Sequence, residues 1–177
     1  MKKQVQLMDE ITVKRTFTRL SYEIVEKSAD LSNVVLVGIK TRGVPMAGIL
    51  ADNIERNTGI RPPICDLDIT FYRDDLHYAP TVKECSFGVD INGKEIIITD
   101  DVLYTGRTIR AAIEAIFSQG RPGKICLAVL IDRGHRELPI RPDYVGKNVP
   151  TSQSEIIKVN FADVDGLTNV MLYDKEN

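Results

Sequence analysis

The sequence has little of what membrane, secreted and metal-binding proteins need. No apolar run approaches the roughly 18 to 20 residues that cross a bilayer, and residues 1–9 lack the long apolar stretch of a signal peptide. The three cysteines, Cys65, Cys85 and Cys126, and the two histidines are scattered without metal-ligand spacing. We therefore expect a cytoplasmic protein without a zinc site, whose cysteines are small buried hydrophobic residues.

The chain also lacks a large excess of positive charge. Its formal net charge is −2, which argues against indiscriminate binding to nucleic acid but does not exclude a local basic patch. With 177 residues, 43% of them apolar, the chain has enough material for one core. We expect a single domain over residues 1–177.

Apolar and charged segments alternate in the order typical of an α/β domain. Asp9 can cap a helix through about residue 27, and Gly59 can end a helix that starts near residue 44. We interpret Asn92-Gly93 as a two-residue hairpin turn and residues 73–86 as a long, mobile loop. The predicted helices cover residues 10–27 (apolar stripe Ile11, Phe17, Leu20, Ile24 and Val25), 44–56 and 108–119, and the predicted strands cover residues 34–39, 66–72, 95–99, 125–131, 144–145, 155–161 and 170–173.

The most informative stretch is residues 96–108, Ile-Ile-Ile-Thr-Asp-Asp-Val-Leu-Tyr-Thr-Gly-Arg-Thr. A buried strand ends at two adjacent carboxylates, Asp100 and Asp101, and a helix opens four residues later. Ligands of α/β sheets bind beyond the carboxyl ends of strands, and the free N–H groups of a helix N-terminus favour phosphate. Because the carboxylates would repel a phosphate beside them, we expect a sugar between them and the helix, with its vicinal hydroxyls donating to the acids.

Each feature of residues 96–108 taken alone also has a purely structural interpretation. The two acids can be a polar strand end, and Thr105 can be a helix cap only. Their order argues for the phosphate and sugar site, and the rival phosphate motifs are absent. The sequence has no Gly-x-Gly-x-x-Gly, and residues 38–43 are followed by Val44-Pro45 instead of Lys-Ser/Thr.

Residues 96–108 resemble the phosphoribosyl pyrophosphate signature of type I phosphoribosyltransferases. Together with Gly-Ile-Lys-Thr-Arg-Gly at 38–43, Tyr-Arg-Asp-Asp at 72–75, and segments 132–141 and 146–152, the chain resembles the PyrR family from about residue 9 to 173. That family comprises pyrimidine-operon attenuation regulators that are also uracil phosphoribosyltransferases. The resemblance implies a central, mostly parallel sheet flanked by helices, with a small irregular hood and a mobile active-site loop.

The implied reaction converts uracil and phosphoribosyl pyrophosphate to UMP and pyrophosphate. The resemblance assigns catalysis to Asp100 and Asp101, the start of the mobile loop to Arg73, Asp74 and Asp75, and Mg²⁺ to a site formed mainly by substrate oxygens. We expect the base pocket near Arg133 and Val159, although the first of these can equally be structural. Residues expected to bind phosphoribosyl pyrophosphate or UMP are Thr41, Arg42, Asp100, Asp101, Val102, Leu103, Tyr104, Thr105, Gly106, Arg107 and Thr108.

The regulatory role implies that the chain binds the leader mRNA of pyrimidine operons when UMP or UTP is bound, as a homodimer or larger homo-oligomer. Residues matching positions that contact RNA in the family are Thr18, Arg19, Tyr22, Arg136, Arg141 and Lys147. From charge pattern alone, the last three can instead be a solvated basic face. The alternatives are a salvage enzyme without RNA binding and a purine phosphoribosyltransferase. Asp132 stands where purine enzymes of this fold place a lysine, which favours uracil.

Overall fold

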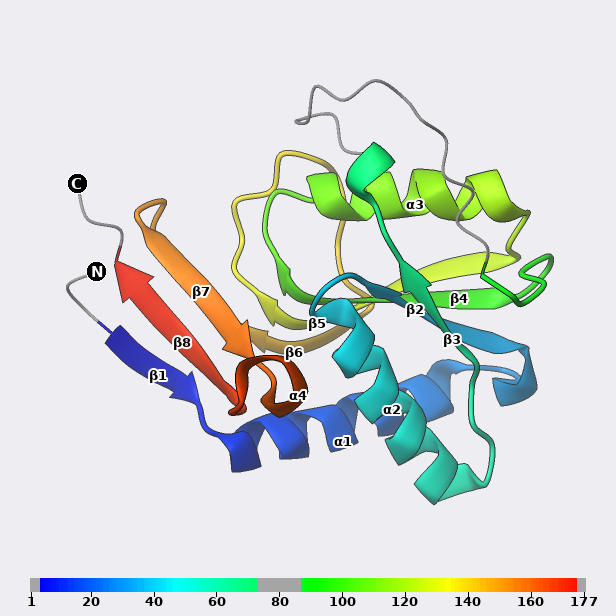
Figure 1. Ribbon diagram of the computed structural model, residues 1–177, viewed down its shortest axis with the longest axis horizontal. Coiled ribbons are helices and arrows are strands. Elements are labelled where there is room, and N and C mark those ends of the chain that lie inside the picture. The colour runs from blue at the N-terminus through cyan, green and yellow to red at the C-terminus, as the bar shows by residue number, and fades with distance from the viewer. Residues whose placement is uncertain (1–3, 73–86, 175–177) are drawn as a thin grey trace.

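The computed structural model describes residues 4–72 and 87–174, and their centre is a parallel sheet (Figure 1). Its strands lie in the order β3-β2-β4-β5-β6, and every neighbouring pair is parallel. The carboxyl ends of the strands therefore meet at one edge, with β4 in the middle. The strands are β2 (Val34–Ile39), β3 (Ile64–Leu67), β4 (Glu95–Leu103), β5 (Lys124–Asp132) and β6 (Tyr144–Asn148).

Helices cover both faces of this sheet. Figure 1 shows α1 (Glu10–Lys27) and α2 (Gly43–Thr58) on one side and α3 (Arg107–Gln119) on the other. The side chains of β2 alternate accordingly: Val34 and Leu36 pack with α1 and α2, whereas Val35 and Val37 pack with α3. Burial on both faces explains why the strand is a continuous apolar run. The α/β class and the mostly parallel sheet are confirmed.

A second, antiparallel sheet forms the hood, with strand order β1-β8-β7. Its strands are β1 (Gln4–Met8), β7 (Glu155–Asn160) and β8 (Asn169–Asp174), and α4 (Ala162–Asp165) joins the last two. Met8, Val159 and Val170 pack with Phe17 of α1, so the hood shares the core beneath the main sheet. The hood is more regular than expected, because β1 pairs along β8 and completes a three-stranded ladder.

The first helix begins as predicted but buries a different stripe. The backbone N–H of Thr12 donates to the Asp9 carboxylate at 2.8 Å, which caps the helix. Phe17, Leu20 and Ile24 are buried, and Val13 completes the stripe with spacings of four and three residues. The prediction for Ile11 was wrong, since its exposed fraction is 59%. It lies two residues from Val13, on another side of the helix.

Several element boundaries differ from the predictions, two of them by more than three residues. The segment 66–72 is not one strand: β3 ends at Leu67, and a 3₁₀ helix covers Thr70–Tyr72 after a turn in which Asp68 accepts from the N–H and hydroxyl of Thr70. The strand predicted to end at residue 99 runs on to Leu103, because its second half pairs with β5. A second 3₁₀ helix, Leu31–Asn33, precedes β2.

Asn92-Gly93 is a turn but not a hairpin. Residues 87–91 form no strand, and Gly93 donates its N–H to the carbonyl of Arg121 at 2.8 Å. The Asn92 side chain accepts from the N–H of Arg121. The turn therefore docks on the connection between α3 and β5 because its polar groups find partners there instead of in a second strand.

The cysteines and the helices of the described residues bear on two of the expectations drawn from the sequence. Cys65 and Cys126 are buried and free, as predicted, and burial raises the pKa of both thiols. Cys85 lies outside the described residues. Within residues 4–72 and 87–174, no helix is long and apolar enough to cross a membrane.

Candidate active site

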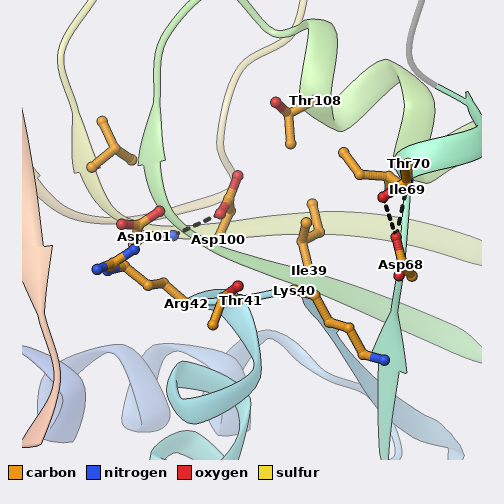
Figure 2. A pocket seen from close by; sticks show the side chains of 11 residues that line it. Ile39, Lys40, Thr41, Arg42, Asp68, Ile69, Thr70, Asp100, Asp101 and Thr108 are labelled. Carbon is orange, nitrogen blue, oxygen red and sulfur yellow. Dashed lines mark hydrogen bonds between the residues drawn. The ribbon is translucent and has the colours of Figure 1, made fainter. Parts of the chain in front are cut away.

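A cavity of about 560 Å³ opens at the carboxyl edge of the sheet, where β2, β3 and β4 end (Figure 2). In Figure 2, Asp100 and Asp101 lie across from Thr41, while Thr108 approaches from the start of α3. Residues far apart in sequence therefore face one space. The cavity is lined by Ile39, Lys40, Thr41, Arg42, Asp68, Ile69, Thr70, Asp100, Asp101, Val102 and Thr108.

The loop after β2 forms one wall because it is pressed against β4. A Cβ atom on Gly43 would lie 2.2 Å from the carbonyl oxygen of Thr99, so only glycine allows this approach. The buried hydroxyl of Thr99 donates to the Gly43 carbonyl at 2.8 Å and secures the contact. The Lys40–Thr41 peptide bond in this loop is cis. Thr41 and Arg42 are thereby held beside the acids of β4.

The two acids lie within β4, close to its carboxyl end, and neither is fully exposed. Burial raises the pKa of Asp100 well above its usual range, and the neighbouring charge of Asp101 adds to the rise. Burial also raises the pKa of Asp101, although the hydrogen bond with Asp100 and the charge of Arg42 oppose it. Two carboxylates held this way gain most from a positive charge placed beside them.

A second cavity, of about 310 Å³, adjoins the first along the loop between β4 and α3. The loop turns at Gly106, which has φ 92° and precedes the first helical residue. The hydroxyl of Thr105 accepts from the N–H of Arg107 at 3.3 Å. Residues 105–108, at the start of α3, line this cavity, and the N-terminus of a helix favours phosphate. Its lining is Asp100, Val102, Leu103, Tyr104, Thr105, Gly106, Arg107, Thr108, Ile109 and Glu137.

Arg42 joins the cavity wall to the hood. Its Nε donates to the carbonyl of Val159 at 2.7 Å, and Nη2 donates to the Asp165 carboxylate at 2.8 Å. Burial raises the pKa of Asp165, but the N–H of Phe161 and the guanidinium of Arg42 outweigh it, so the net shift is downward. The guanidinium also lies near Asp101 (Figure 2). The arginine predicted to hold pyrophosphate is thus already an ion-pair partner.

The sequence did not predict one wall of the first cavity. Asp68, Ile69 and Thr70 line the cavity opposite the acids, in the turn after β3. The signal was available in part: Asp-x-Thr is a spacing in which the acid accepts from the hydroxyl and N–H two residues later, and this predicts a turn rather than a strand. Arg73, Asp74 and Asp75, which follow, lie outside the described residues.

The two residues predicted for the base pocket are both buried and line neither cavity. The guanidinium of Arg133 donates to the hydroxyl of Thr151 and to the carbonyls of Ser152 and Glu155. It also stacks 4.1 Å from the ring centre of Tyr104. Their role in recognising a base stays a prediction.

Of the residues predicted to contact RNA, Arg19 and Lys147 lie where α1 packs against β6. Arg19 donates to the carbonyls of Val145 and Gly146, next to exposed Lys147. A Cβ atom on Gly146 would lie 2.4 Å from the carbonyl oxygen of Leu130, so this packing needs glycine. Thr18 and Tyr22 lie on the same helix but face α2: Thr18 lines a hollow with Asp52, and the hydroxyl of Tyr22, which is 55% exposed, donates to Asn57. Arg141 is also exposed.

Arg136 differs from the other five. Its guanidinium donates inside the protein, to the carbonyls of Tyr104, Gly134 and Ile140, and pairs with the carboxylate of Asp132. Only 21% of the side chain is exposed. These interactions do not test the predicted contact of Arg136 with RNA. They show that its guanidinium links segments within the fold.

Within the described residues, no group of three or more histidine, cysteine, aspartate or glutamate side chains could enclose a metal ion. Asp100 and Asp101 nevertheless offer the hard oxygen ligands that Mg²⁺ prefers. The donor set fits an ion that takes most of its ligands from a substrate, and not one held in a protein cage.

Comparison with known proteins identifies the class. A model of the phosphoribosyl transferase domain family matches residues 5–163. A crystal structure of a hypoxanthine phosphoribosyltransferase from Staphylococcus aureus superposes with a TM-score of 0.73 and 20% identity, covering 97% of this chain and 92% of that one. At this identity the likeness shows the fold alone. The fold, the cavity at the carboxyl edge and the family match define a phosphoribosyltransferase.

Closer relatives narrow the class. Proteins named bifunctional protein PyrR from Thermoanaerobacter pseudethanolicus and Clostridium perfringens are 54% and 53% identical to this chain. They align over 99% and 97% of it, and over 100% and 98% of their own lengths. The chain belongs to the PyrR family, as its motifs predicted.

Proposed function

We propose that this chain transfers the phosphoribosyl group of phosphoribosyl pyrophosphate to uracil, forming UMP and pyrophosphate. We also propose that, with a uridine nucleotide bound, it binds the leader mRNA of pyrimidine biosynthesis genes and promotes transcription attenuation. The observation that carries the enzyme proposal is the pair Asp100 and Asp101 beside the start of α3, where two cavities share Asp100, Val102 and Thr108 in their linings. The bifunctional name of relatives above 50% identity supports the second activity.

Asp100 and Asp101 stabilise the reacting sugar. The bond at the anomeric carbon breaks with positive charge developing on the ribose, and carboxylates near its hydroxyls stabilise that charge. Burial raises the pKa of both acids, and a cation beside them favours their ionised form, with which it interacts strongly where water is excluded. Among the described residues lining the two cavities, there is no histidine to act as a general base.

Each of the two cavities binds a different phosphate group of the substrate. The N–H groups and hydroxyls of segment 105–108 bind the 5′-phosphate at the start of α3, and Val102, Leu103 and Tyr104 shape the approach to it. Thr41 and Arg42 bind the pyrophosphate from the loop after β2. For Arg42, this requires the guanidinium to share its donors between Asp165 and the ligand.

Asp100 and Asp101 would lie beside a Mg²⁺ ion that enters with phosphoribosyl pyrophosphate and takes most of its ligands from the substrate, and such an ion would neutralise charge on the departing pyrophosphate. The chain's own contribution is to place these acids on the ribose side, where the sugar hydroxyls lie between them and the helix start.

Base choice is tested by direct competition. Asp132 ends β5 where purine enzymes place a lysine, and it accepts from the N–H of Gly134 and pairs with Arg136. We place the base pocket by Arg133 and the backbone near Val159. Turnover of uracil, hypoxanthine and guanine should be measured with the same enzyme. We expect only uracil to react, and faster conversion of a purine would overturn the proposal.

The RNA surface is proposed on α1 and β6, with Thr18, Arg19 and Tyr22 on the helix and Arg141 and Lys147 beside it. Structured RNA is recognised by backbone shape and exposed loops, so a few basic residues repeated in a homo-oligomer suffice. A gel shift of a pyrimidine-operon leader with and without UMP tests this. Absence of binding in both conditions would leave a salvage enzyme.

A further inference from the structure

The segment after β5 lies directly on the phosphate loop, residues 104–106. The N–H groups of Glu137 and Leu138 donate to the carbonyl of Thr105 at 2.9 and 3.2 Å. The guanidinium of Arg136 donates to the carbonyl of Tyr104 at 2.8 Å. Both carbonyls of the phosphate loop that precede Gly106 are therefore bound by residues 136–138.

These contacts have a consequence for phosphate binding. A loop that presents its N–H groups to an anion must turn its carbonyls away from that anion, and those carbonyls then need donors from elsewhere. Arg136, Glu137 and Leu138 supply those donors from the outer side. A Cβ atom on Gly106 would lie 3.5 Å from side-chain atoms of Leu138 and Ile140, so the same segment also packs against the turn.

Arg136 makes several side-chain contacts within this segment and with its neighbours. Besides Tyr104, its guanidinium donates to the carbonyls of Gly134 and Ile140 and pairs with the carboxylate of Asp132 at the end of β5. One planar group therefore ties β5, its following segment and the phosphate loop together. Lysine has a single ammonium on a flexible stem and cannot reproduce this fork of donors.

The same segment leads to the proposed RNA surface. Five residues beyond Arg136 it reaches exposed Arg141, which lines a hollow of about 460 Å³ together with Arg136 and Val145 of β6. A second bridge, from Arg107 Nε to the Glu137 carboxylate at 2.6 Å, joins the segment to α3. The nucleotide site and the RNA surface thus share one stretch of chain.

We propose that Arg136 is a positioning residue of the phosphate loop and not an RNA contact, and that segment 134–141 couples nucleotide binding to RNA binding. This rests on the proposed function for the RNA half only. A phosphate seated on α3 favours the clamped loop, and the clamp holds the stretch that carries Arg141. Linkage makes the coupling reciprocal, so RNA tightens UMP as much as UMP tightens RNA.

The test compares Arg136→Lys and Arg136→Ala with variants at three other positions, Arg121, Glu137 and Arg141. UMP affinity is measured by calorimetry, and leader-RNA affinity is measured with and without UMP over a salt series. We expect Arg136→Lys to weaken UMP about tenfold, as loss of charged hydrogen bonds does, and to reduce the factor by which UMP tightens RNA. Its slope of log RNA affinity against log salt should match wild type.

The controls separate position from contact. Arg121→Lys changes another arginine that donates to backbone carbonyls, those of Phe117 and Gly120, away from the phosphate loop, and should leave UMP affinity within twofold. Arg141→Ala should weaken RNA equally with and without UMP and lower the salt slope by about 1. Glu137→Gln should weaken UMP in the same direction as Arg136→Lys, by a smaller factor.

Three results would overturn the inference. One is wild-type UMP affinity in Arg136→Lys, and another is an unchanged UMP effect on RNA. The third is a salt slope lowered by about 1 in Arg136→Ala, which would make this residue a phosphate contact. The UMP measurement needs no RNA, so a protein that binds UMP but no leader would refute the RNA function while still deciding the role of Arg136.

Discussion

The proposed nucleotide site and the proposed RNA surface are built in opposite ways. Nine consecutive residues, 100–108, supply half of the residues that line the two cavities of the first site, and a single strand, loop and helix start bring these nine together. The RNA surface draws on α1 and β6, which are more than 100 residues apart and meet through Arg19 and Gly146. A contiguous site depends on local geometry, whereas the discontinuous surface depends on how elements pack.

The largest expected effect lies in the contiguous site. Asp100→Asn and Asp101→Asn should each lower kcat about 10²- to 10³-fold, because one electrostatic contact to the developing cation is lost. The measurement is steady-state uracil turnover on variants whose folding is verified by circular dichroism. Near-wild-type kcat in both variants would remove these acids from the mechanism.

Two glycines test whether the regions are independent. Gly43→Ala and Gly146→Ala each place a Cβ against a backbone oxygen, of Thr99 and Leu130 respectively. Overpacking of this kind costs roughly 1 to 3 kcal/mol of unfolding free energy. Urea titration measures that cost. We expect Gly43→Ala to impair uracil turnover most, and Gly146→Ala to impair RNA binding most. Equal damage to both activities by both variants would contradict the division.

Single contacts on the RNA surface should matter less. With a net charge of −2, affinity for RNA must come from a local patch, so each lost phosphate contact is visible. Arg141→Ala and Lys147→Ala should each lower the slope of log affinity against log salt by about 1 while uracil turnover persists. Unchanged slopes in both would place the RNA surface elsewhere.

The smallest effect expected is the opposite pH dependence of two acids. The pKa of Asp100 is raised, so the folded state binds its proton more tightly than the unfolded chain does. That contribution to stability is present at low pH and is lost as pH rises through the raised value. Asp165 has a lowered pKa, so its contribution is present above the unfolded value and is lost as pH falls.

Unfolding by urea from about pH 2 to pH 8 checks both signs, because the contribution of Asp165 changes only at acidic pH, below its ordinary pKa. Toward neutral pH, Asp100→Asn should become more stable relative to wild type, and Asp165→Asn should become less stable. Parallel curves for the two variants would show that one of the signs is wrong.

Much of the main sheet was predictable because its strands are buried on both faces. Continuous apolar runs such as 34–39 and 125–131 stand out from the polar segments beside them. The hood was harder. β1 is a short strand with one polar face, and it becomes a strand only by pairing with β8, about 165 residues later in the chain.

For the proposed site, local patterns were enough to predict the chemistry, because paired acids, a glycine turn and hydroxyls at a helix start all lie within residues 100–108. Contacts between residues far apart in the sequence depended on the packing of the elements. Packing brought Asp68 opposite Asp100, tied Arg42 to the hood and turned Arg136 inward onto Tyr104. Charged side chains are compatible with any exposed position, so their type does not reveal their role. The role depends on which partners the folded chain places beside them.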